Sequence, residues 1–327
     1  MPRFVLNYDL RHPAEFGVSG RDLYAAALDQ IAWADGLGFS MVAFGEHHQS
    51  PDGYIPSPLV FAAAVGGRTR RIRVRVSVLL GLLYNPIRLA EEIAVADLCL
   101  GGRLDVGIGV GYVRDDFEMF GADYDRRGPA LEELVALLRQ AWTGEPFDHH
   151  GRRVRVTPRP AQDPMPINLG GSVPRAIERA ARIGDGYFPP MPALWSRYRR
   201  ACTDLGRADP GPLPPNGPIF TWVTREDPDT VWERLTPHIL HQIRSYAEWT
   251  AAAYGEPMGP FVPTKVLDDV RQGGAYRVLT PEEAVELARG LGPDGRFNLS
   301  PLLAGIDPAW SWEMLRCFER EVLPNLT

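Results

Sequence analysis

The chain has 327 residues, of which 45% are hydrophobic, and a formal net charge of −6. This length can bury a large core, either as two domains or as one α/β barrel, which often exceeds the usual size of a domain. The mild negative charge argues against a nucleic-acid partner. The most basic stretches, residues 68–75 and 197–200, are expected at the solvated edges of a strand and a helix.

The cysteines and the first residues indicate the compartment. Cys99, Cys202 and Cys317 are odd in number and far apart, which fits free thiols in a reducing compartment better than a disulfide framework. The N-terminal stretch MPRFVLNYDL lacks the apolar core of a signal peptide, and no apolar run reaches membrane-spanning length. We therefore expect a soluble, cytoplasmic protein.

Short apolar runs alternate with stretches of helical periodicity along the whole chain. Strands are expected over residues 4–7, 41–44, 72–80, 104–108, 167–169, 187–188, 220–223 and 298–299. Helices are expected over residues 23–34, 59–65, 86–100, 132–142, 174–183, 196–205, 229–254, 281–291 and 310–322. Ser19 and Asp22 are spaced as a capping box for the first helix, and Asn85 can cap the helix that begins at Pro86.

This alternation of strands and helices without a break in composition favours a single (β/α)8 barrel over residues 1–327. A doubly wound sheet is the alternative. Residues 255–276 are rich in glycine, proline and charge without periodicity, and we expect a mobile lid there.

Three polar residues, Glu46, His47 and His48, directly follow the second predicted strand. In parallel α/β proteins, polar residues just past the carboxyl end of a strand lie at the mouth of the site. A carboxylate and two imidazoles at this position are suited to proton transfer. The alternative is that the histidines are hydrogen-bonded structural residues. Adjacent histidines point apart, which makes them a poor metal pair.

Glycines follow two other predicted strands. Gly107, Gly109 and Gly111 are too closely spaced for a dinucleotide fingerprint, but glycines at a strand end indicate close approach of another group, here a flat ring. Gly170, Gly171 and Ser172 separate a strand from a helix whose first turn holds Arg175, and such amides, hydroxyl and guanidinium suit a phosphate. The alternative is an ordinary serine cap with Arg175 in solvent.

The remaining histidines give weaker evidence for a functional site. His149 and His150 lie in a polar turn and are expected in solvent, whereas His238 and His241 share a helix face that could hold a metal if other ligands lay nearby. We predict no metal site. The chain has no G-x-S-x-G elbow and no P-loop, so the sequence does not support a serine hydrolase or a nucleotide kinase.

Several of these stretches together resemble the bacterial luciferase-like flavin monooxygenase family. They are GEHH after the second strand, NPIRLAEEIAVADLCLGGRLDVGIGVGY through the fourth, NLGGSVPRAIERAARIGDGYF around the fifth, and VLTPEEAVELA and FEREVLPNL near the C-terminus. The resemblance runs over nearly the whole chain. It implies a (β/α)8 TIM barrel with loop insertions, usually dimeric, that binds reduced FMN or a deazaflavin at the carboxyl ends of the strands.

The resemblance also implies roles for individual residues. His47 matches the catalytic histidine of luciferase, with Glu46 and His48 beside it, and Ser77–Val78 matches a non-prolyl cis peptide beneath the flavin ring. Residues at two further strand ends match the remaining cofactor contacts: Gly109, Val110, Gly111, Tyr112, Gly170, Gly171, Ser172 and Arg175. Tyr54, Tyr84, Asn85 and Tyr112 lie near strand ends and are expected to line the substrate pocket, although packing in the core would also explain the tyrosines.

One position departs from the family. Luciferase has an arginine for the flavin phosphate where this chain has Val110, and Arg175 is expected to supply that charge instead. Ser–Val at the cis position occurs among deazaflavin relatives, whereas Glu-His-His is closer to the FMN enzymes, so we favour FMN.

The resemblance implies a monooxygenase that receives reduced FMN from a separate reductase and acts on a small organic substrate. Oxygen would form a flavin C4a-hydroperoxide in a dry pocket, and His47 would transfer protons there. Two alternatives remain, a deazaflavin-dependent oxidoreductase that transfers hydride without oxygen, and a non-catalytic flavin-binding relative. The presence of both His47 and His48 weighs against a non-catalytic protein.

Overall fold

The computed structural model describes residues 1–258, 261 and 267–326. Contacts between Cα atoms divide it into two compact units. Unit 1 comprises Met1–Ala43, Ser50–Ile55 and Pro214–Thr327, and unit 2 comprises Phe44–Gln49 and Pro56–Leu213. Among the described helices, none is long and apolar enough to cross a membrane.

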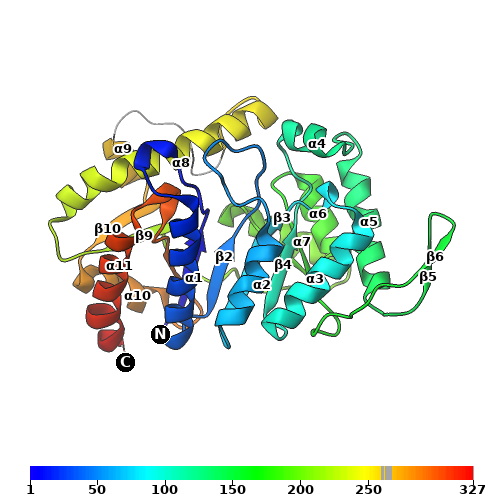
Figure 1. Ribbon diagram of the computed structural model, residues 1–327, viewed down its shortest axis with the longest axis horizontal. Coiled ribbons are helices and arrows are strands. Elements are labelled where there is room, and N and C mark those ends of the chain that lie inside the picture. Colours follow the sequence, from blue (N-terminus) through cyan, green and yellow to red (C-terminus); the bar gives the residue numbers. More distant parts are fainter. Residues whose placement is uncertain (259–260, 262–266, 327) are drawn as a thin grey trace. The chain divides into compact units, whose positions relative to one another are not determined.

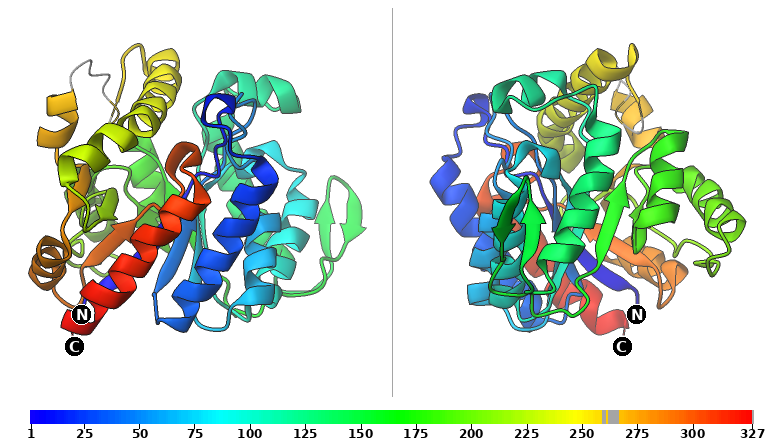
Figure 2. Two further views of the ribbon diagram at one scale, coloured as in Figure 1. Left: turned by 60° about the vertical axis from the view of Figure 1, so that its left-hand side comes forward. Right: turned by 90° about the vertical axis from the view of Figure 1, so that its right-hand side faces the viewer.

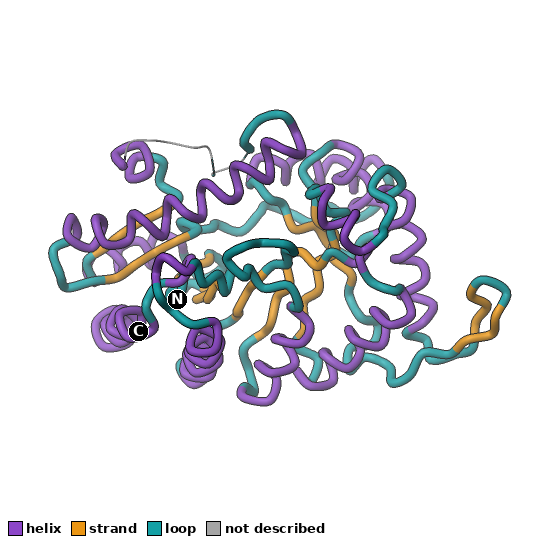
Figure 3. The backbone as a smooth tube through the Cα atoms, turned by 45° about the horizontal axis from the view of Figure 1, so that its top comes forward, coloured by secondary structure: helices purple, strands orange, loops and turns teal. Residues whose placement is uncertain are grey.

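Unit 1 contains two pairs of parallel strands and the helices that follow them. Strand β1 (Arg3–Tyr8) pairs with β11 (Arg296–Leu299), and β9 (Phe220–Val223) pairs with β10 (Tyr276–Leu279). The α-helices of unit 1 are α1 (Gly20–Gly36), α8 (Pro228–Tyr254), α9 (Leu267–Gln272), α10 (Pro281–Leu291) and α11 (Pro308–Cys317). A π-helix follows α11 over Phe318–Val322. Pro237 lies inside α8, and Figure 3 shows this long helix as one continuous tube.

Unit 2 is built on four parallel strands in the order β3 (Arg73–Leu79), β4 (Leu104–Ile108), β7 (Ile167–Gly170) and β8 (Gly186–Phe188). Its helices are α2 (Pro58–Arg68), α3 (Pro86–Leu100), α4 (Arg114–Phe120), α5 (Arg127–Ala141), α6 (Pro174–Ile183) and α7 (Trp195–Asp204). An antiparallel hairpin of β5 (Phe147–His149) and β6 (Arg152–Val154) stands out from the rest of this unit (Figure 2).

Strand β2 (Met41–Phe44) is the buried run predicted before Glu46, and unit 2 begins at its last residue. The predicted caps are also confirmed. Ser19 accepts a hydrogen bond from the Asp22 amide, and Asn85 accepts hydrogen bonds from the amides of Ile87 and Arg88. These caps satisfy backbone donors that a helix start otherwise leaves open, which is why the residues predicted these boundaries.

Helix α2 does not end at Val65 as predicted but continues through Gly66 and Gly67 to Arg68. A Cβ on Gly66 would lie 2.5 Å from the carbonyl oxygen of Cys99, so the glycine allows the backbones of α2 and α3 to approach closely. Figure 1 shows the two helices side by side.

The sequence prediction was also wrong at α9, which lies within the segment assigned to a lid, and at β10, whose first residue ends that segment. Tyr276 and Val278 are buried while Arg277 is exposed, so the alternation of a half-buried strand was present in the sequence. The prediction of mobility stays untested, and residues 259–260 and 262–266 of that segment lie outside the described part of the chain.

Two arginines of the basic stretch 68–75 are not simply solvated. Arg73 and Arg75 on β3 both bind the Asp105 carboxylate on β4, and the Arg75 guanidinium lies 4.3 Å from the centre of the Phe188 ring. On α7 the prediction of a solvated edge is confirmed for Arg197, which is exposed and pairs with Glu178, whereas Arg199 is half-buried and pairs with Asp209.

A buried charge cluster that the sequence did not predict holds the Ser50–Ile55 segment in unit 1. The Arg11 side chain is fully buried and forms an ion pair with Asp52, which also lies 2.8 Å from Nε2 of His241 on α8. Asp9 lies 3.7 Å from Nε of the same guanidinium. Three aromatic rings surround it at 4.8–5.4 Å, those of Tyr54, Tyr246 and Trp249.

The two carboxylates of this cluster titrate differently. Burial raises the pKa of Asp9 to about 6, despite the Arg11 charge. Burial also acts to raise the pKa of Asp52, but the hydrogen bond from His241 and the Arg11 charge outweigh it and hold that pKa well below its usual range. Both carboxylates are therefore ionised at pH 7, and Asp52 is the one that stays ionised beside Arg11 as the pH falls below about 6.

We expect the substitution Asp52→Asn to lower the free energy of unfolding by about 3–5 kcal/mol at pH 7, since it removes one partner of a buried ion pair and leaves Arg11 with Asp9 alone. Because the folded-state pKa of Asp52 lies below the unfolded value near 3.9, this contribution is present above about pH 4 and is lost as the pH falls further. Denaturant unfolding at several pH values measures it.

The matched control is Asp294→Asn, which removes the exposed ion pair with Arg3. Surface pairs contribute only about 0–1 kcal/mol. A loss for Asp52→Asn no larger than that of the control would contradict a stabilising role for the cluster.

Candidate active site

The Glu46 carboxylate is the centre of the candidate site in unit 2. It is 3% exposed and accepts three hydrogen bonds, from the Leu80 amide at 2.6 Å, the Tyr84 hydroxyl at 2.8 Å and Nε2 of His48 at 3.0 Å. An ionised carboxylate only accepts hydrogen bonds, so Nε2 of His48 carries the hydrogen of this contact. In a neutral His48 the other ring nitrogen, Nδ1, is then an acceptor.

Tyr84 supports the same arrangement. Burial raises the pKa of its hydroxyl, and the Glu46 charge raises it further, so the tyrosine remains a hydrogen-bond donor. The sequence had placed Tyr84 and Asn85 in a substrate pocket. The structure shows Tyr84 bonded to Glu46, and the side-chain oxygen of Asn85 capping α3.

The two histidine rings face different neighbours. His47 is buried, and its ring lies edge-to-face with Tyr112 at 5.8 Å between centres. The His48 ring packs edge-to-face on Phe120 of α4 at 4.7 Å. The sequence argument that adjacent histidines point apart therefore agrees with these contacts. His48 is held by Glu46 and α4, while His47 lies next to the residues that follow β4.

The end of β3 is reshaped by a β-bulge. Ser77 is opposite Gly107 and Leu79 is opposite Ile108, so Val78 is the extra residue on β3. The Ser77–Val78 peptide bond is cis, as the family resemblance implied. Ser77 is exposed although the rest of the strand is buried or half-buried, so this strand end is open to a ligand.

Glycines make room for the bulge on both sides. A Cβ on Gly109 or on Gly170 would lie 2.6 Å from a methyl group of Val78, and a Cβ on Gly107 would lie 2.4 Å from the Phe188 ring. Real Cβ atoms do not approach other atoms so closely, so these positions require glycine. The glycines after β4 and in β7 therefore shape one surface around Val78.

The predicted phosphate loop follows β7. Gly171 has φ of +148°, and a Cβ there would lie 2.5 Å from Ala176. The N-cap of α6 is Val173, and no side chain caps this helix, which contradicts the alternative that Ser172 is its cap. Arg175 is exposed and makes no ion pair with the described part of the chain. Pro174 at the first position has no N–H, and the amides of Ala176 and Ile177 donate to the Val173 carbonyl oxygen. The groups that this helix start offers to a phosphate are therefore mainly the Ser172 hydroxyl and the unpaired Arg175 guanidinium.

Val110, Gly111 and Tyr112 follow β4 as predicted. Gly111 has φ of +73°, a conformation that favours glycine, and Phe117 lies directly against it. The remaining predicted residue, Tyr54, lies in unit 1, where it is buried against Arg11 and bonded to the Tyr246 hydroxyl.

Sequence reasoning missed one residue of this site, Asp116 in the first turn of α4. Its side chain is almost fully buried and its charge environment includes Glu46 and His48. Asp116 directly follows Asp115, which is exposed. The sequence alone does not show which of the two aspartates is buried.

The paired histidines of α8 are engaged in hydrogen bonds. Nδ1 of His238 lies 2.9 Å from the Ala304 carbonyl oxygen, and His241 binds Asp52. Within the described ranges, no group of three or more His, Cys, Asp or Glu side chains is arranged to hold a metal ion.

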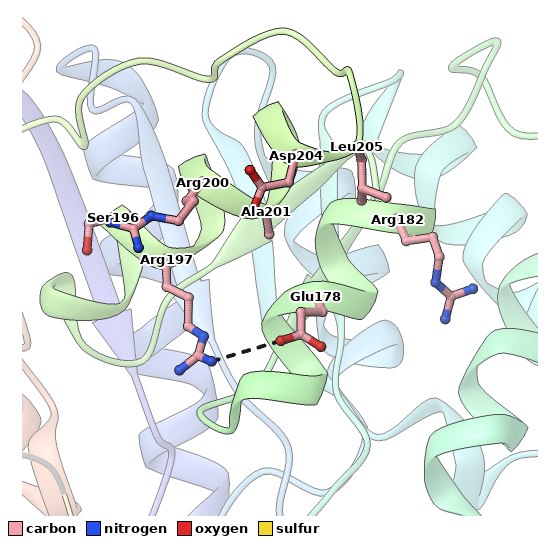
Figure 4. A pocket seen from close by; sticks show the side chains of 8 residues that line it. All are labelled: Glu178, Arg182, Ser196, Arg197, Arg200, Ala201, Asp204 and Leu205. Atoms are coloured by element: carbon pink, nitrogen blue, oxygen red, sulfur yellow. Dashed lines mark ion pairs between the residues drawn. The ribbon is translucent and has the colours of Figure 1, made fainter.

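A cavity of about 750 Å³ lies elsewhere in unit 2, along the outer faces of α6 and α7. Figure 4 shows Arg197 of α7 directed toward Glu178 of α6, at 3.9 Å. None of the predicted site residues lines this cavity, so its location does not coincide with the Glu46 cluster.

Known proteins resemble this chain in sequence and in structure. The flavin-dependent trigonelline monooxygenase, oxygenase component, of Acinetobacter baylyi is 28% identical over 50% of this chain and 48% of its own. The F420-dependent glucose-6-phosphate dehydrogenase of Nakamurella multipartita is 33% identical over 49% of this chain and 50% of its own. The aligned part thus spans about half the length of these relatives.

Similarity of structure extends further along the chain. The monooxygenase RslO1 from Streptomyces bottropensis has a TM-score of 0.74 and 26% identity, covering 99% of this chain and 100% of its own. The predicted fold class, a luciferase-like α/β fold of the TIM-barrel type, is therefore confirmed. The profile of the luciferase-like monooxygenases matches residues 8–288, and this chain belongs to that family.

Proposed function

We propose that this protein is a monooxygenase that uses reduced FMN and O2 to oxygenate a small organic substrate, with a separate flavin reductase as the source of electrons. The observation that carries the proposal is the Glu46–His48 pair beside His47, in the same unit as the glycine-lined bulge at Val78. Membership of the luciferase-like monooxygenases and similarity to a flavin-dependent oxygenase component support it.

The residues at the strand ends fit a flavin. The exposed Ser77 and the glycines around Val78 leave a surface without protruding side chains, as a flat ring requires. The start of α6 with Ser172 and Arg175 suits a phosphate group. When bound, reduced FMN would supply the electrons that activate O2.

In this proposal, residues of the protein orient the histidine rings and transfer protons. The Glu46 carboxylate fixes the His48 ring through Nε2, and the neighbouring His47 ring is the group that we expect to exchange protons with the reacting molecules. Burial of Glu46 and both rings limits access of bulk water, which favours controlled proton transfer.

A second candidate is hydride transfer with a deazaflavin. The similarity to an F420-dependent dehydrogenase favours it, as does Val110 in place of an arginine. The same residues would bind either ring system. Identifying which cofactor the protein binds therefore distinguishes the two functions.

We predict that the protein binds reduced FMN and that the complex reacts with oxygen. Purified protein is titrated with reduced FMN and with reduced F420, and each complex is mixed with oxygen in a stopped-flow absorbance experiment. A long-lived transient with FMN supports the monooxygenase. Binding of F420 alone, without an oxygen reaction, would replace the proposal with the second candidate.

The substitution His47→Ala should leave the Kd for reduced FMN within about two-fold and slow the absorbance changes after oxygen mixing about 100-fold, the usual contribution of a proton-transfer group. His149→Ala, in the β5–β6 hairpin, is the matched control and should change neither. Unchanged kinetics in the His47 variant would remove the role assigned to this ring.

The substitution Arg175→Ala should weaken FMN binding about 10- to 100-fold, because a charge-assisted hydrogen bond contributes about 1.5–3 kcal/mol. Binding of riboflavin, which lacks the phosphate, should not change. Arg197→Ala, on the outer cavity of α6 and α7, is the control and should affect neither ligand. Equal losses for FMN and riboflavin in the Arg175 variant would refute the phosphate contact.

A further inference from the structure

One face of the sheet in unit 2 carries a charge cluster next to the bulge. On β3, Val74 and Val76 are fully buried, while the alternate residues Arg73, Arg75 and Ser77 are half-buried or exposed. The two arginines therefore project from the same face of β3 as Ser77. Residues two apart on a strand are separated by about 6–7 Å, so Arg75 is the neighbour of Ser77 on this face.

The charges of this cluster do not balance. Both guanidinium groups bind one carboxylate, that of Asp105 on β4, and Nη2 of Arg75 lies 3.3 Å from Oδ2. Among the described residues neither arginine pairs with a second carboxylate, and Nε of Arg75 is buried without a hydrogen-bond partner. Arginine stays protonated in proteins, so the cluster has one positive charge in excess.

Contacts of the Phe188 ring place the Arg75 charge near the bulge. The centre of this ring lies 4.3 Å from the guanidinium carbon of Arg75, and a Cβ on Gly107 would lie 2.4 Å from the same ring. Gly107 is the partner of Ser77 in the register of β3 and β4. The excess charge thus lies beside the Ser77–Gly107 pair, at the strand ends where the proposed function places the flavin ring.

The charge of a flavin ring depends on its redox state. The ring of oxidised FMN is uncharged near neutral pH, whereas two electrons and one proton convert it to a reduced ring with one negative charge. The phosphate group is the same in both forms. An excess positive charge next to the ring therefore stabilises bound reduced FMN more than bound oxidised FMN.

We propose that the cluster of Arg73, Arg75 and Asp105 makes the site select the reduced, anionic form of FMN over the oxidised form. The cluster acts through its charge and not through a proton transfer. This inference rests on the proposed function, because it concerns the same cofactor, and it adds the residues that distinguish the two redox states. Such selectivity lets the protein take up reduced FMN from a reductase and release FMN that has been oxidised.

The test is the ratio of two dissociation constants, the Kd of oxidised FMN divided by the Kd of reduced FMN measured without oxygen. The substitution Arg75→Gln should lower this ratio about three- to ten-fold, because it removes the excess charge from a partly buried site. Arg75→Lys should restore most of the ratio, and Asp105→Asn should raise it. The matched control is Arg152→Gln on the β5–β6 hairpin, which removes an exposed positive charge and should leave the ratio unchanged.

The same ratio in Arg75→Gln, in Arg152→Gln and in the unsubstituted protein would overturn the proposal. Arg73→Gln removes an equal charge at a side chain that is 39% exposed, and it replaces Arg75→Gln if that variant does not fold. If the unsubstituted protein bound neither form of FMN, the proposed function itself would be contradicted.

A measurement without cofactor tests the excess charge directly. In a Ser77→Cys variant the cluster should stabilise the thiolate, so adding Arg75→Gln should make this thiol bind its proton about three- to ten-fold more tightly. The titration is followed by ultraviolet absorbance, as the difference from the same protein with Ser77, which removes the signal of Cys99, Cys202 and Cys317. Equal proton binding with and without Arg75 would overturn the proposal, whatever the result with FMN.

Discussion

One buried carboxylate, that of Glu46, determines the arrangement of the candidate site. Its hydrogen bonds to the Leu80 amide, the Tyr84 hydroxyl and the His48 ring join two segments that are separate in the sequence, the one after β2 and the one after β3. A buried carboxylate requires such partners, because an ionised group removed from water is otherwise very costly. Satisfying Glu46 therefore also fixes the end of β3 and the orientation of a histidine, so stability and function depend on the same contacts.

The end of β3 shows how backbone geometry serves a site. The bulge at Val78 turns this side chain toward Gly109 and Gly170, and the absence of a Cβ at both glycines is what makes that packing possible. A side chain at either position would displace Val78 and with it the exposed Ser77. Bulges are frequent next to active sites for this reason, since one extra residue redirects a strand end without changing the rest of the sheet.

In unit 1, the buried charges form a cluster of ion pairs around Arg11. Arg11 is compensated by Asp52 and Asp9 and surrounded by aromatic rings, and Asp52 in turn is bonded to His241. Every charge in this cluster has an opposite charge beside it, which suits a stabilising role. Hydrogen bonding is nevertheless incomplete in both units, since Nε and Nη2 of Arg11 and Oδ1 of Asp116 are buried without a partner in the described structure. Arg175 in unit 2 remains exposed and makes no ion pair with the described residues.

The sequence by itself determined the alternation of strands and helices, the caps at Ser19 and Asn85, and the position of Glu46 and the histidines after β2. These features depend on residues within a few positions of one another, where periodicity and capping act directly. Only the tertiary structure decided that Tyr84 binds Glu46, that Asp116 is buried while Asp115 is exposed, and that Arg11 pairs with Asp52. Those contacts join residues far apart in the chain or separate neighbours that are chemically identical, and burial, which arises only on folding, distinguishes them.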